Sequence, residues 1–394
     1  IWLAFFLILG VLSFRQLLGQ NYKGAIVQIP CATPNEVLNF YRGEDTTTII
    51  KACTTNAYGI GSVELPSTGR YRIKAGSVWR SDFSWWKILG DTTYALDLSA
   101  RKLNNIRYAD RYTSIHSAIN SLPSSGGMVF IPAGIYTVDS TIKVKSNIAL
   151  IGAGIGITIL KAKDNLNDDI IENANLYDSN IVISDLTIDG NKANQGDEAV
   201  YNMFGITMGY GELMARENIL IKNVEVKNCK EQGIAINGNN MRVENSIIRD
   251  CKWDNLHVRG KDIIINSVTS YGSTNDIGIE INGSDRVIVS DCISNNNAIA
   301  GIYIYNSKNV LIDNSMLKQN GNGIWITNGD STELCERITI QNCIADSNSE
   351  IGIKLWISGD NINWKGIKNV IIKGNILRYN KYIPIRIMSN ATRD

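Results

Sequence analysis

Four residues able to exchange protons lie close together in the middle of the chain. Asp254 and His257 fall within one short segment, and Asp276 and Glu280 fall at similar places in the next. Two carboxyl groups, one protonated and one ionised, are what most glycoside hydrolases use to cleave a sugar–sugar bond. A base next to a cation would instead remove a proton beside a uronate carboxylate, as a lyase does. These four residues are the candidate catalytic group, and Asp254 with Asp276 could also hold a hard cation such as Ca²⁺.

An internal repeat must position these residues. A second alternating strand, of the form G-I-x-I, follows most units of the repeat, for example GIEI at residue 278 and GIWI at residue 323. Alternation of apolar residues marks a strand with one buried face, and repeats of this length stack into a solenoid. We therefore predict a parallel β-helix over residues 106–394. The apolar triplets that open the units begin at Ile181, Ile219, Met241, Ile263, Val287, Val310, Ile338 and Val370.

Asparagine and aspartate recur at two fixed positions when the units are aligned on their first apolar residue. Such residues tolerate a left-handed backbone and form side-chain ladders when stacked once per repeat. We predict that they are structural and exclude them from the catalytic candidates. The fifth position holds Asp185, Asn223, Asn245, Ser267, Asp291, Asn314, Asn342 and Gly374. The eleventh position holds Asn191, Cys229, Cys251, Ser273, Asn297, Asn320, Asn348 and Asn380.

The chain has seven cysteines and no C-x-x-C pair, which argues against a zinc ribbon. Cys229 and Cys251 fall in the same column of the repeat, one unit apart. They are either joined by a disulfide or remain as two small buried thiols. Cys31 and Cys53 could form a disulfide that stabilises the small N-terminal module.

The residue between the two isoleucines of each G-I-x-I strand is predicted to point outward. Aromatic side chains there can stack on sugar rings, and charged side chains can bind sugar hydroxyls. We predict an exposed strip that binds an extended glycan. The outward column reads Thr207, Ala235, His257, Glu280, Tyr303, Trp325, Lys354 and Arg386, and the column two residues further on reads Asn237, Arg259, Asn282, Tyr305, Thr327 and Trp356. The candidate substrate-binding residues are Arg259, Tyr303, Tyr305, Trp325, Lys354 and Trp356.

The segment before the repeat predicts a cap for the first turn of the coil. Ile115, Ala118, Ile119 and Leu122 have helical spacing, and GGMVFIPAGIYTV follows them. This segment resembles the entry cap of the pectate lyase superfamily, with its pattern G-G-x-V-x-[IV]-P-x-G-x-Y. The resemblance extends from the cap to the end of the chain and implies a right-handed parallel β-helix and a polysaccharide substrate. The reaction type is not implied, because the catalytic motifs of the polygalacturonase-like hydrolases and the alginate epimerases are absent.

The N-terminal third has a different character. Residues 1–20 are mostly apolar and match part of a signal peptide, so we expect export to the cell surface, the periplasm or the medium; a retained membrane anchor is the alternative. Residues 21–90 predict a small β-sandwich module, a spacer or docking domain, and residues 91–105 a linker. The formal net charge of +1 gives no general attraction to nucleic acid.

Together these patterns predict an all-β, exported enzyme, a lyase or a glycoside hydrolase, that acts on a polysaccharide. One alternative is a non-catalytic glycan-binding or adhesive surface protein that uses Tyr303, Trp325 and Trp356 as stacking platforms. Another is a structural solenoid whose polar strip is merely solvated. The last unit is followed only by SNATRD, so we expect further chain or a partner at that end.

Overall fold

The computed structural model contains two compact units, Ile1–Asn105 and Ile106–Asp394. In the first unit it describes seven strands, and in the second it describes residues 106–197, 203–209, 217–329, 334–357 and 366–389. The predicted signal peptide and the side chains of Cys31 and Cys53 lie outside the described residues. Within the part of the chain that is described, no helix is both long and apolar enough to cross a bilayer.

The first unit forms two sheets. One sheet has the order β4-β1-β7, and the other has the order β3-β2-β5-β6 with antiparallel pairing throughout. The strand predicted at AIVQI corresponds to β1. The bounds are β1 (Ala25–Ile29), β2 (Val37–Arg42), β3 (Ile49–Thr54), β4 (Gly61–Leu65), β5 (Gly69–Ala75), β6 (Val78–Trp85) and β7 (Tyr94–Ala95).

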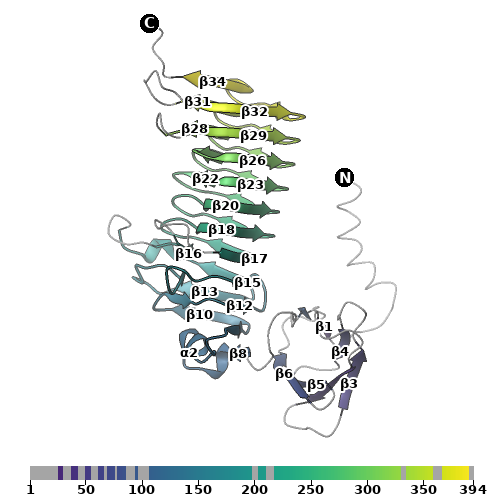
Figure 1. Cartoon of the computed structure of the whole chain (residues 1–394). Helices are drawn as coiled ribbons and strands as arrows, with labels where there is room; N and C mark the ends of the chain where they lie inside the picture. The colour runs from purple at the N-terminus through teal and green to yellow at the C-terminus, as the bar shows by residue number, and fades with distance from the viewer. Residues whose placement is uncertain are drawn as a thin grey trace. The chain divides into compact units, whose positions relative to one another are not determined.

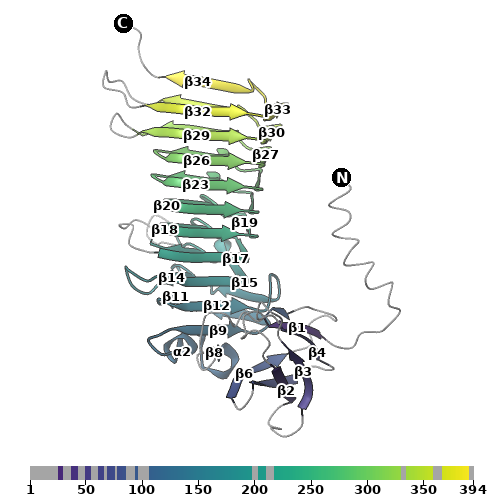
Figure 2. The ribbon, with the colours of Figure 1, turned by 45° about the vertical axis from the view of Figure 1, so that its right-hand side comes forward.

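The second unit is a coil in which each turn, or rung, consists of three short strands joined by tight bends. Each strand pairs in parallel with the strand at the same place in the next rung, so three parallel sheets run along the coil. In Figure 1 the third sheet lies on the left and the first on the right, and in Figure 2 the first sheet faces the viewer. We predicted two strands per rung; the third arises because the short segment between them also pairs with its neighbours.

The first sheet contains β8 (Ile106–Tyr108), β9 (Gly127–Ile131), β12 (Ile148–Gly152), β23 (Asp285–Ser290), β26 (Lys308–Asp313), β29 (Cys335–Gln341) and β32 (Ile367–Lys373). The second contains β10 (Gly134–Val138), β13 (Thr158–Ala162), β19 (Ile247–Arg249), β21 (Thr269–Tyr271), β24 (Ile293–Asn295), β27 (Met316–Lys318), β30 (Ile344–Asp346) and β33 (Ile376–Arg378). The third contains β11 (Ile142–Val144), β14 (Ile171–Asn173), β16 (Ile206–Met208), β22 (Ile277–Asn282), β25 (Ala300–Tyr305), β28 (Asn322–Asn328), β31 (Ile353–Ile357) and β34 (Ile385–Ser389). Four longer strands bend from one sheet into another: β15 (Ile181–Asp189), β17 (Glu217–Lys227), β18 (Ile234–Glu244) and β20 (Leu256–Asn266).

The core of the coil is a stack of aliphatic side chains. The two isoleucines of each G-I-x-I strand point inward, and those of β22, β25 and β28 are fully buried. Because successive side chains of a strand point to opposite faces, the residue between them must point away from the core. The predicted alternation is therefore confirmed, and it fixes the side on which the polar and aromatic side chains lie.

Left-handed residues and an asparagine ladder form the bends of the coil. At the fifth position of all eight aligned units φ is positive, from 45° at Asn314 to 65° at Gly374. At the eleventh position the side-chain oxygen of Asn320 accepts hydrogen bonds from the backbone N and the Nδ2 of Asn297, both at 3.0 Å. Asn348 and Asn380 continue the pattern in the next two rungs. We call Asn297, Asn320, Asn348 and Asn380 the asparagine ladder; its predicted structural role is confirmed.

The cap forms as predicted. Helix α2 (Ile115–Asn120) begins at Ser114, whose Oγ accepts a hydrogen bond from the backbone N of Ser117. Its apolar face buries Ile115, Ala118 and Ile119 in the core, and the helix lies at the start of the coil beside β8 (Figure 1). The 3-10 turns η2 (Ala109–Arg111) and η3 (Lys192–Asn194) complete the helical segments that the structure describes. Cys229 and Cys251, for which a disulfide was left open, are free buried thiols.

Candidate functional site

The register of the third sheet brings the predicted outward residues into one column. Glu280 pairs with His257 on one side and with Tyr303 on the other. Trp325 pairs with Tyr303 and with Lys354, and Lys354 pairs with Arg386. We call the outward residues from Glu172 to Arg386 the third-sheet column: Glu172, Thr207, Ala235, His257, Glu280, Tyr303, Trp325, Lys354 and Arg386.

The prediction that this strip is exposed is wrong for most of its length. His257 is 9% exposed and Lys354 is 8% exposed, whereas Glu280, Tyr303 and Trp325 are half-buried. Paired strands lie only about 4.8 Å apart, so large side chains on successive rungs cover one another. Tightly packed, half-buried side chains are held in fixed positions, which a site for chemistry requires.

His257 lies between two carboxyl groups near the middle of the column. Its Nδ1–H donates to Oε2 of Glu280 at 2.8 Å, and Oδ2 of Asp254 lies 3.4 Å from the same nitrogen. Asp254, only 2% exposed, also accepts hydrogen bonds from Nε2 of Gln232 at 3.1 Å and from the backbone N of Ile277 at 3.2 Å. The buried carboxylate of Asp254 therefore positions the ring of His257, whereas Glu280 lies nearer to solvent.

The charges of His257 and Glu280 depend on each other. Burial by itself would lower the pKa of His257, but hydrogen bonds to Asp254 and Glu280 raise that pKa to about 9. Burial by itself would raise the pKa of Glu280, but the hydrogen bond and positive charge of His257 lower it to about 2. At neutral pH the pair is therefore an imidazolium beside a carboxylate, and His257 has no free electron pair on Nδ1 to act as a base.

Asp276 is a half-buried carboxyl group whose pKa is raised toward neutral pH. Burial raises the pKa of Asp276 to about 6, and the negative charge of Glu280 adds to that effect. Burial also raises the pKa of Asp254, helped by Glu280 and opposed by His257. The pKa values of Asp276 and Glu280 are therefore well separated. Such a separation makes Asp276 the candidate acid and Glu280 the candidate base.

One detail of the predicted geometry is wrong. We predicted that Asp254 and Asp276 occupy matching positions, but the register sets Leu256 beside Ile279, so that Asp254 matches Ile277. Arg249 pairs with Tyr271 and Leu256 with Ile279, so the later rung has one residue more between these paired positions, and Asp276 lies one residue earlier relative to its strand. The acid–base cluster still comprises Asp254, His257, Asp276 and Glu280.

The donors around Asp254 bear on whether this cluster could hold a metal ion. One ligand atom from each of Asp254, His257 and Glu280 lies within 4.8 Å of the others. Both oxygens of Asp254 accept N–H groups, however, and Nδ1 of His257 donates to Glu280. Ca²⁺ takes about six to eight oxygen ligands, and few oxygens here are free of donors. The residues fit an exchange of protons better than a calcium site.

An aromatic cluster with one lysine adjoins the acid–base cluster on the C-terminal side. The rings of Tyr303 and Trp325 meet edge to face at 5.2 Å, and those of Trp325 and Trp356 stack at 5.7 Å. Tyr305 stacks on Tyr303 at 6.0 Å. Nζ of Lys354 lies 3.9 Å from the ring centre of Trp325 and 4.9 Å from that of Trp356. Tyr303, Tyr305, Trp325 and Trp356 thus form a continuous surface rather than four separate platforms.

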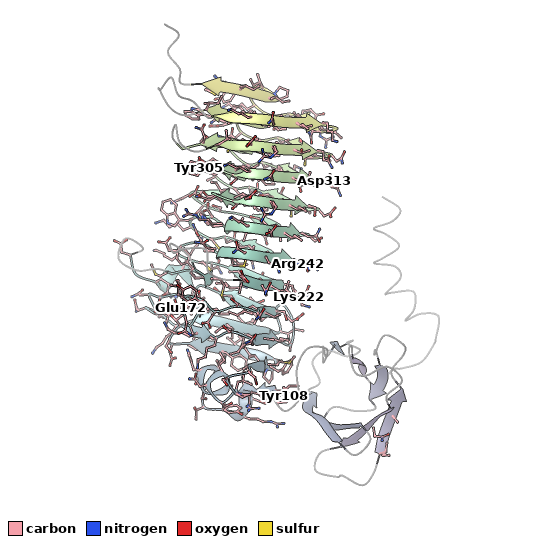
Figure 3. All side chains as sticks on the ribbon, in the orientation of Figure 1. Tyr108, Glu172, Lys222, Arg242, Tyr305 and Asp313 are labelled. Carbon is pink, nitrogen blue, oxygen red and sulfur yellow. The ribbon has the colours of Figure 1, made fainter. Side chains whose placement is uncertain are left out.

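Tyr305 and Arg259 lie in the second predicted column. Gly329 contacts Tyr305 closely: a Cβ at Gly329 would lie 2.0 Å from the hydroxyl oxygen of the tyrosine, so a larger residue there would displace the ring. Arg259 is exposed and passes beside Gly283. Figure 3 labels Tyr305 and Glu172 on the side of the coil where the third sheet lies, and Lys222, Arg242 and Asp313 on the other side. Five of the six predicted binding residues pack against one another, and Arg259 lies outside that group.

Two further acids, Asp169 and Glu231, lie beside the N-terminal part of the column and were not predicted from the sequence. Burial raises the pKa of Asp169 to about 6 and that of Glu231 to about 7. Gln232 follows Glu231 directly and donates to Asp254, so this second pair of acids leads to the acid–base cluster. The alternating segment Ile171–Asn173 was the available signal, but the long insertion after it hid its register with Thr207.

Comparison with a family model and with solved structures shows the fold. Residues 175–366 match the family described as right handed beta helix region. The N-terminal fragment of gene product 12 of bacteriophage phi29 superposes with a TM-score of 0.55 at 19% identity, over 68% of this chain and 56% of that one. The coil is therefore a right-handed parallel β-helix, as the sequence predicts.

Curated relatives resemble parts of the chain. Mannuronan C5-epimerase AlgE5 of Azotobacter vinelandii is 26% identical over 261 residues, which cover 59% of this chain and 25% of that protein. Alginate lyase 7 of the same organism is 34% identical over 132 residues, or 30% of this chain and 15% of that protein. The matched regions thus span a quarter or less of these relatives.

Proposed function

We propose that this chain is an exported carbohydrate-active enzyme that binds an extended polysaccharide along the third-sheet column and hydrolyses it at the acid–base cluster. The observation that carries this proposal is the pairing of an ionised carboxylate, Glu280, with a carboxyl group that titrates near pH 6, Asp276. The aromatic cluster begins one rung away, at Tyr303. The names of the curated relatives, which act on mannuronan and alginate, support a polysaccharide as the substrate class.

Each residue of the cluster has a distinct role in this mechanism. Asp276 protonates the oxygen of the glycosidic bond as it breaks, and Glu280 supplies the negative charge that the oxocarbenium-like transition state requires. A water molecule then bonds to the anomeric carbon and gives a proton to Asp276, which restores the acid. His257 keeps Glu280 ionised through the hydrogen bond at 2.8 Å. Asp254, which accepts a hydrogen bond from Gln232, positions the ring of His257. Neither Asp254 nor Gln232 touches the substrate in this mechanism. General acid catalysis of this kind contributes about 10²–10⁴-fold to a rate.

A second candidate reaction is proton removal beside a uronate carboxylate, in a lyase or an epimerase. The names of the relatives favour it, and Lys354 and Arg259 could bind uronate carboxylates. Against it, His257 is protonated at neutral pH and Glu280 is a weak base, because the pKa of Glu280 is lowered to about 2. Hydrolysis is therefore the better match to the electrostatics of this cluster.

The central experiment compares the wild type with Glu280→Gln on a panel of neutral and acidic polysaccharides. Reducing ends report hydrolysis, and ultraviolet absorbance of unsaturated ends reports elimination. We expect new reducing ends from the wild type and a loss of about 10³-fold in turnover for Glu280→Gln, since the neutral amide cannot stabilise positive charge. Glu217→Gln, which changes an exposed carboxylate outside the third sheet, is the matched control and should keep full activity.

Three outcomes would contradict hydrolysis at this cluster. Detection of unsaturated ends would show that the reaction is elimination and not hydrolysis. Binding without any product would favour the adhesive alternative. Full turnover by Glu280→Gln, and by a double variant that also carries His257→Ala, would place the chemistry elsewhere in the chain.

The N-terminal segments belong to the same proposal. We propose that residues 1–20 are part of a signal peptide, that residues 21–90 are a spacer or docking module, and that residues 91–105, of which Tyr94 and Ala95 pair with β1, link this module to the coil. Determining the N-terminus of the protein recovered after expression tests the first point. A mature chain that begins near Gln20 is expected, and retention of residues 1–20 in a membrane fraction would favour an anchor.

A further inference from the structure

Lys354 is a buried cation without a carboxylate partner among the described residues. The residue is 8% exposed, and its Nζ lies over the indole rings of Trp325 and Trp356. Neither a hydrogen bond nor an ion pair of Lys354 occurs in the described part of the coil. Contacts with aromatic faces offset only part of the cost of removing a charge from water. The ammonium group of Lys354 therefore has N–H donors that a ligand can use.

Trp325 provides a second unused donor beside the first. Its Nε1 is buried and donates to no acceptor in the described residues. Indole N–H groups usually find a partner when buried, because a buried donor without an acceptor is unfavourable. Nζ of Lys354 lies 3.9 Å from the ring centre of the same indole, so the two donors belong to adjoining side chains.

The surrounding charges also favour a negative ligand. Arg386 occupies the next rung of the column, in register with Lys354, so two cations follow each other. Glu350 is the carboxylate whose field reaches Lys354, but its side chain accepts a hydrogen bond from Nδ2 of Asn322. Two adjacent cations and an indole N–H group without an acceptor in the described residues make this end of the column electropositive.

We propose that Lys354 and the Nε1–H of Trp325 form a subsite for an anionic substituent of the glycan, a carboxylate, a sulfate ester or a phosphate. That the ligand is a glycan rests on the proposed function. That it carries a negative charge rests on Lys354 and Trp325 alone. Lys354 lies three rungs from Glu280 through Tyr303 and Trp325. Three spacings of about 4.8 Å place the bound anion roughly 14 Å from the acid–base cluster. The subsite thus selects chains that carry a charge at that distance from the bond to be cleaved.

The test uses the full chain and three small probes: glucuronate, inorganic sulfate and glycerol phosphate. Binding is followed by the ¹⁵N–¹H resonance of the Trp325 indole, which is assigned by its disappearance in Trp325→Phe. We expect at least one probe to shift this resonance in a saturable way, and the probe that binds tightest identifies the anion. Lys354→Met should weaken that binding at least about tenfold, because truncating one partner of a buried charged contact usually costs that much or more.

Lys261→Met, which removes an exposed lysine of the first sheet, is the matched control and should leave the titration unchanged. Lys354→Gln serves as a second variant if the methionine variant does not fold. Absence of a shift with all three probes, or equal binding by wild type and Lys354→Met, would overturn the subsite. This readout needs no turnover, so a failure of hydrolysis at Glu280 and a failure of the anion subsite remain distinguishable.

Discussion

The asparagine ladder and the third-sheet column are both stacks of one side chain per rung, yet they differ in kind. In the ladder the same residue type repeats, and each side chain donates to one neighbour and accepts from another. In the column the type changes at almost every rung, from His257 through Glu280 and Tyr303 to Lys354. Repetition satisfies the hydrogen bonds of a solenoid, whereas variation leaves charges and donors that a ligand can use. Variation within a stacked column is therefore the better sign of a functional site.

The largest expected effect is on stability: a substitution in the asparagine ladder should lower stability without changing turnover. Asn320→Ala removes the acceptor of Asn297 and the donor to the carbonyl oxygen of Ser294, and leaves several buried polar groups unpaired. We expect a loss of about 3 kcal/mol in the free energy of unfolding, measured by urea titration, with unchanged turnover well below the unfolding transition. Asn275→Ala, in an exposed bend, should change stability by less than about 0.5 kcal/mol. A comparison in which Asn320→Ala lost turnover but Glu280→Gln lost stability would reverse the assignment of the two columns.

A smaller effect tests whether the ionisation of Asp169, a buried carboxyl group beside Thr207 of the column, lowers stability. The pKa of Asp169 is raised above its usual value, to about 6, so deprotonation is harder in the folded state. The wild type should therefore lose stability as pH rises from about 4 to about 6, since the folded state there binds more protons than the unfolded state. Asp169→Asn keeps the acceptor for the backbone N of Phe204 but cannot ionise.

We expect Asp169→Asn to match the wild type near pH 4 and to exceed it in the free energy of unfolding at pH 7 by about 3 kcal/mol, from urea unfolding at both values. His257, whose pKa is raised to about 9, is unchanged by this substitution, so its own pH dependence cancels in the difference. An equal difference at both pH values would show that Asp169 does not titrate as the structure indicates.

A further prediction concerns the pH dependence of turnover. If Asp276 is the acid, its protonated form is needed, and activity should fall by about tenfold for each pH unit above about 6. Glu280, with a pKa lowered to about 2, stays ionised over this range and adds no limb. Asp276→Asn should lower turnover and abolish the alkaline limb in a profile of kcat/KM against pH. A limb that persists in this variant would assign the acid to another group.

The smallest expected effect is that of metal removal. Because both oxygens of Asp254 accept N–H donors, we expect treatment with a chelator to change turnover by less than about twofold. Adding back Ca²⁺ serves as the control. A loss of activity that Ca²⁺ restores would mean that the cluster rearranges around a cation, and the donors on Asp254 would then have to be displaced.

Much of the fold follows from the sequence, because a solenoid encodes its register in its repeat. The fifth-position residues, such as Asn314 and Gly374, share a positive φ because each closes the same bend. The outward column could likewise be read from the G-I-x-I strands. The offset of Asp276 was missed because one extra residue in a bend leaves the strand pattern intact, and Asp169 was missed because the insertion after Ile171–Asn173 conceals the register.

The sequence alone determined the solenoid, its cap, the structural asparagines and the order of residues along the column, because these depend on the period of the repeat and on which face each strand buries. Only the tertiary structure decided the chemistry. It placed Nδ1 of His257 2.8 Å from Glu280, removed Asp254 from solvent, and set Lys354 against the indole of Trp325. The physical reason is that pKa values and unpaired donors depend on distance and burial between rungs, which a one-dimensional pattern does not contain.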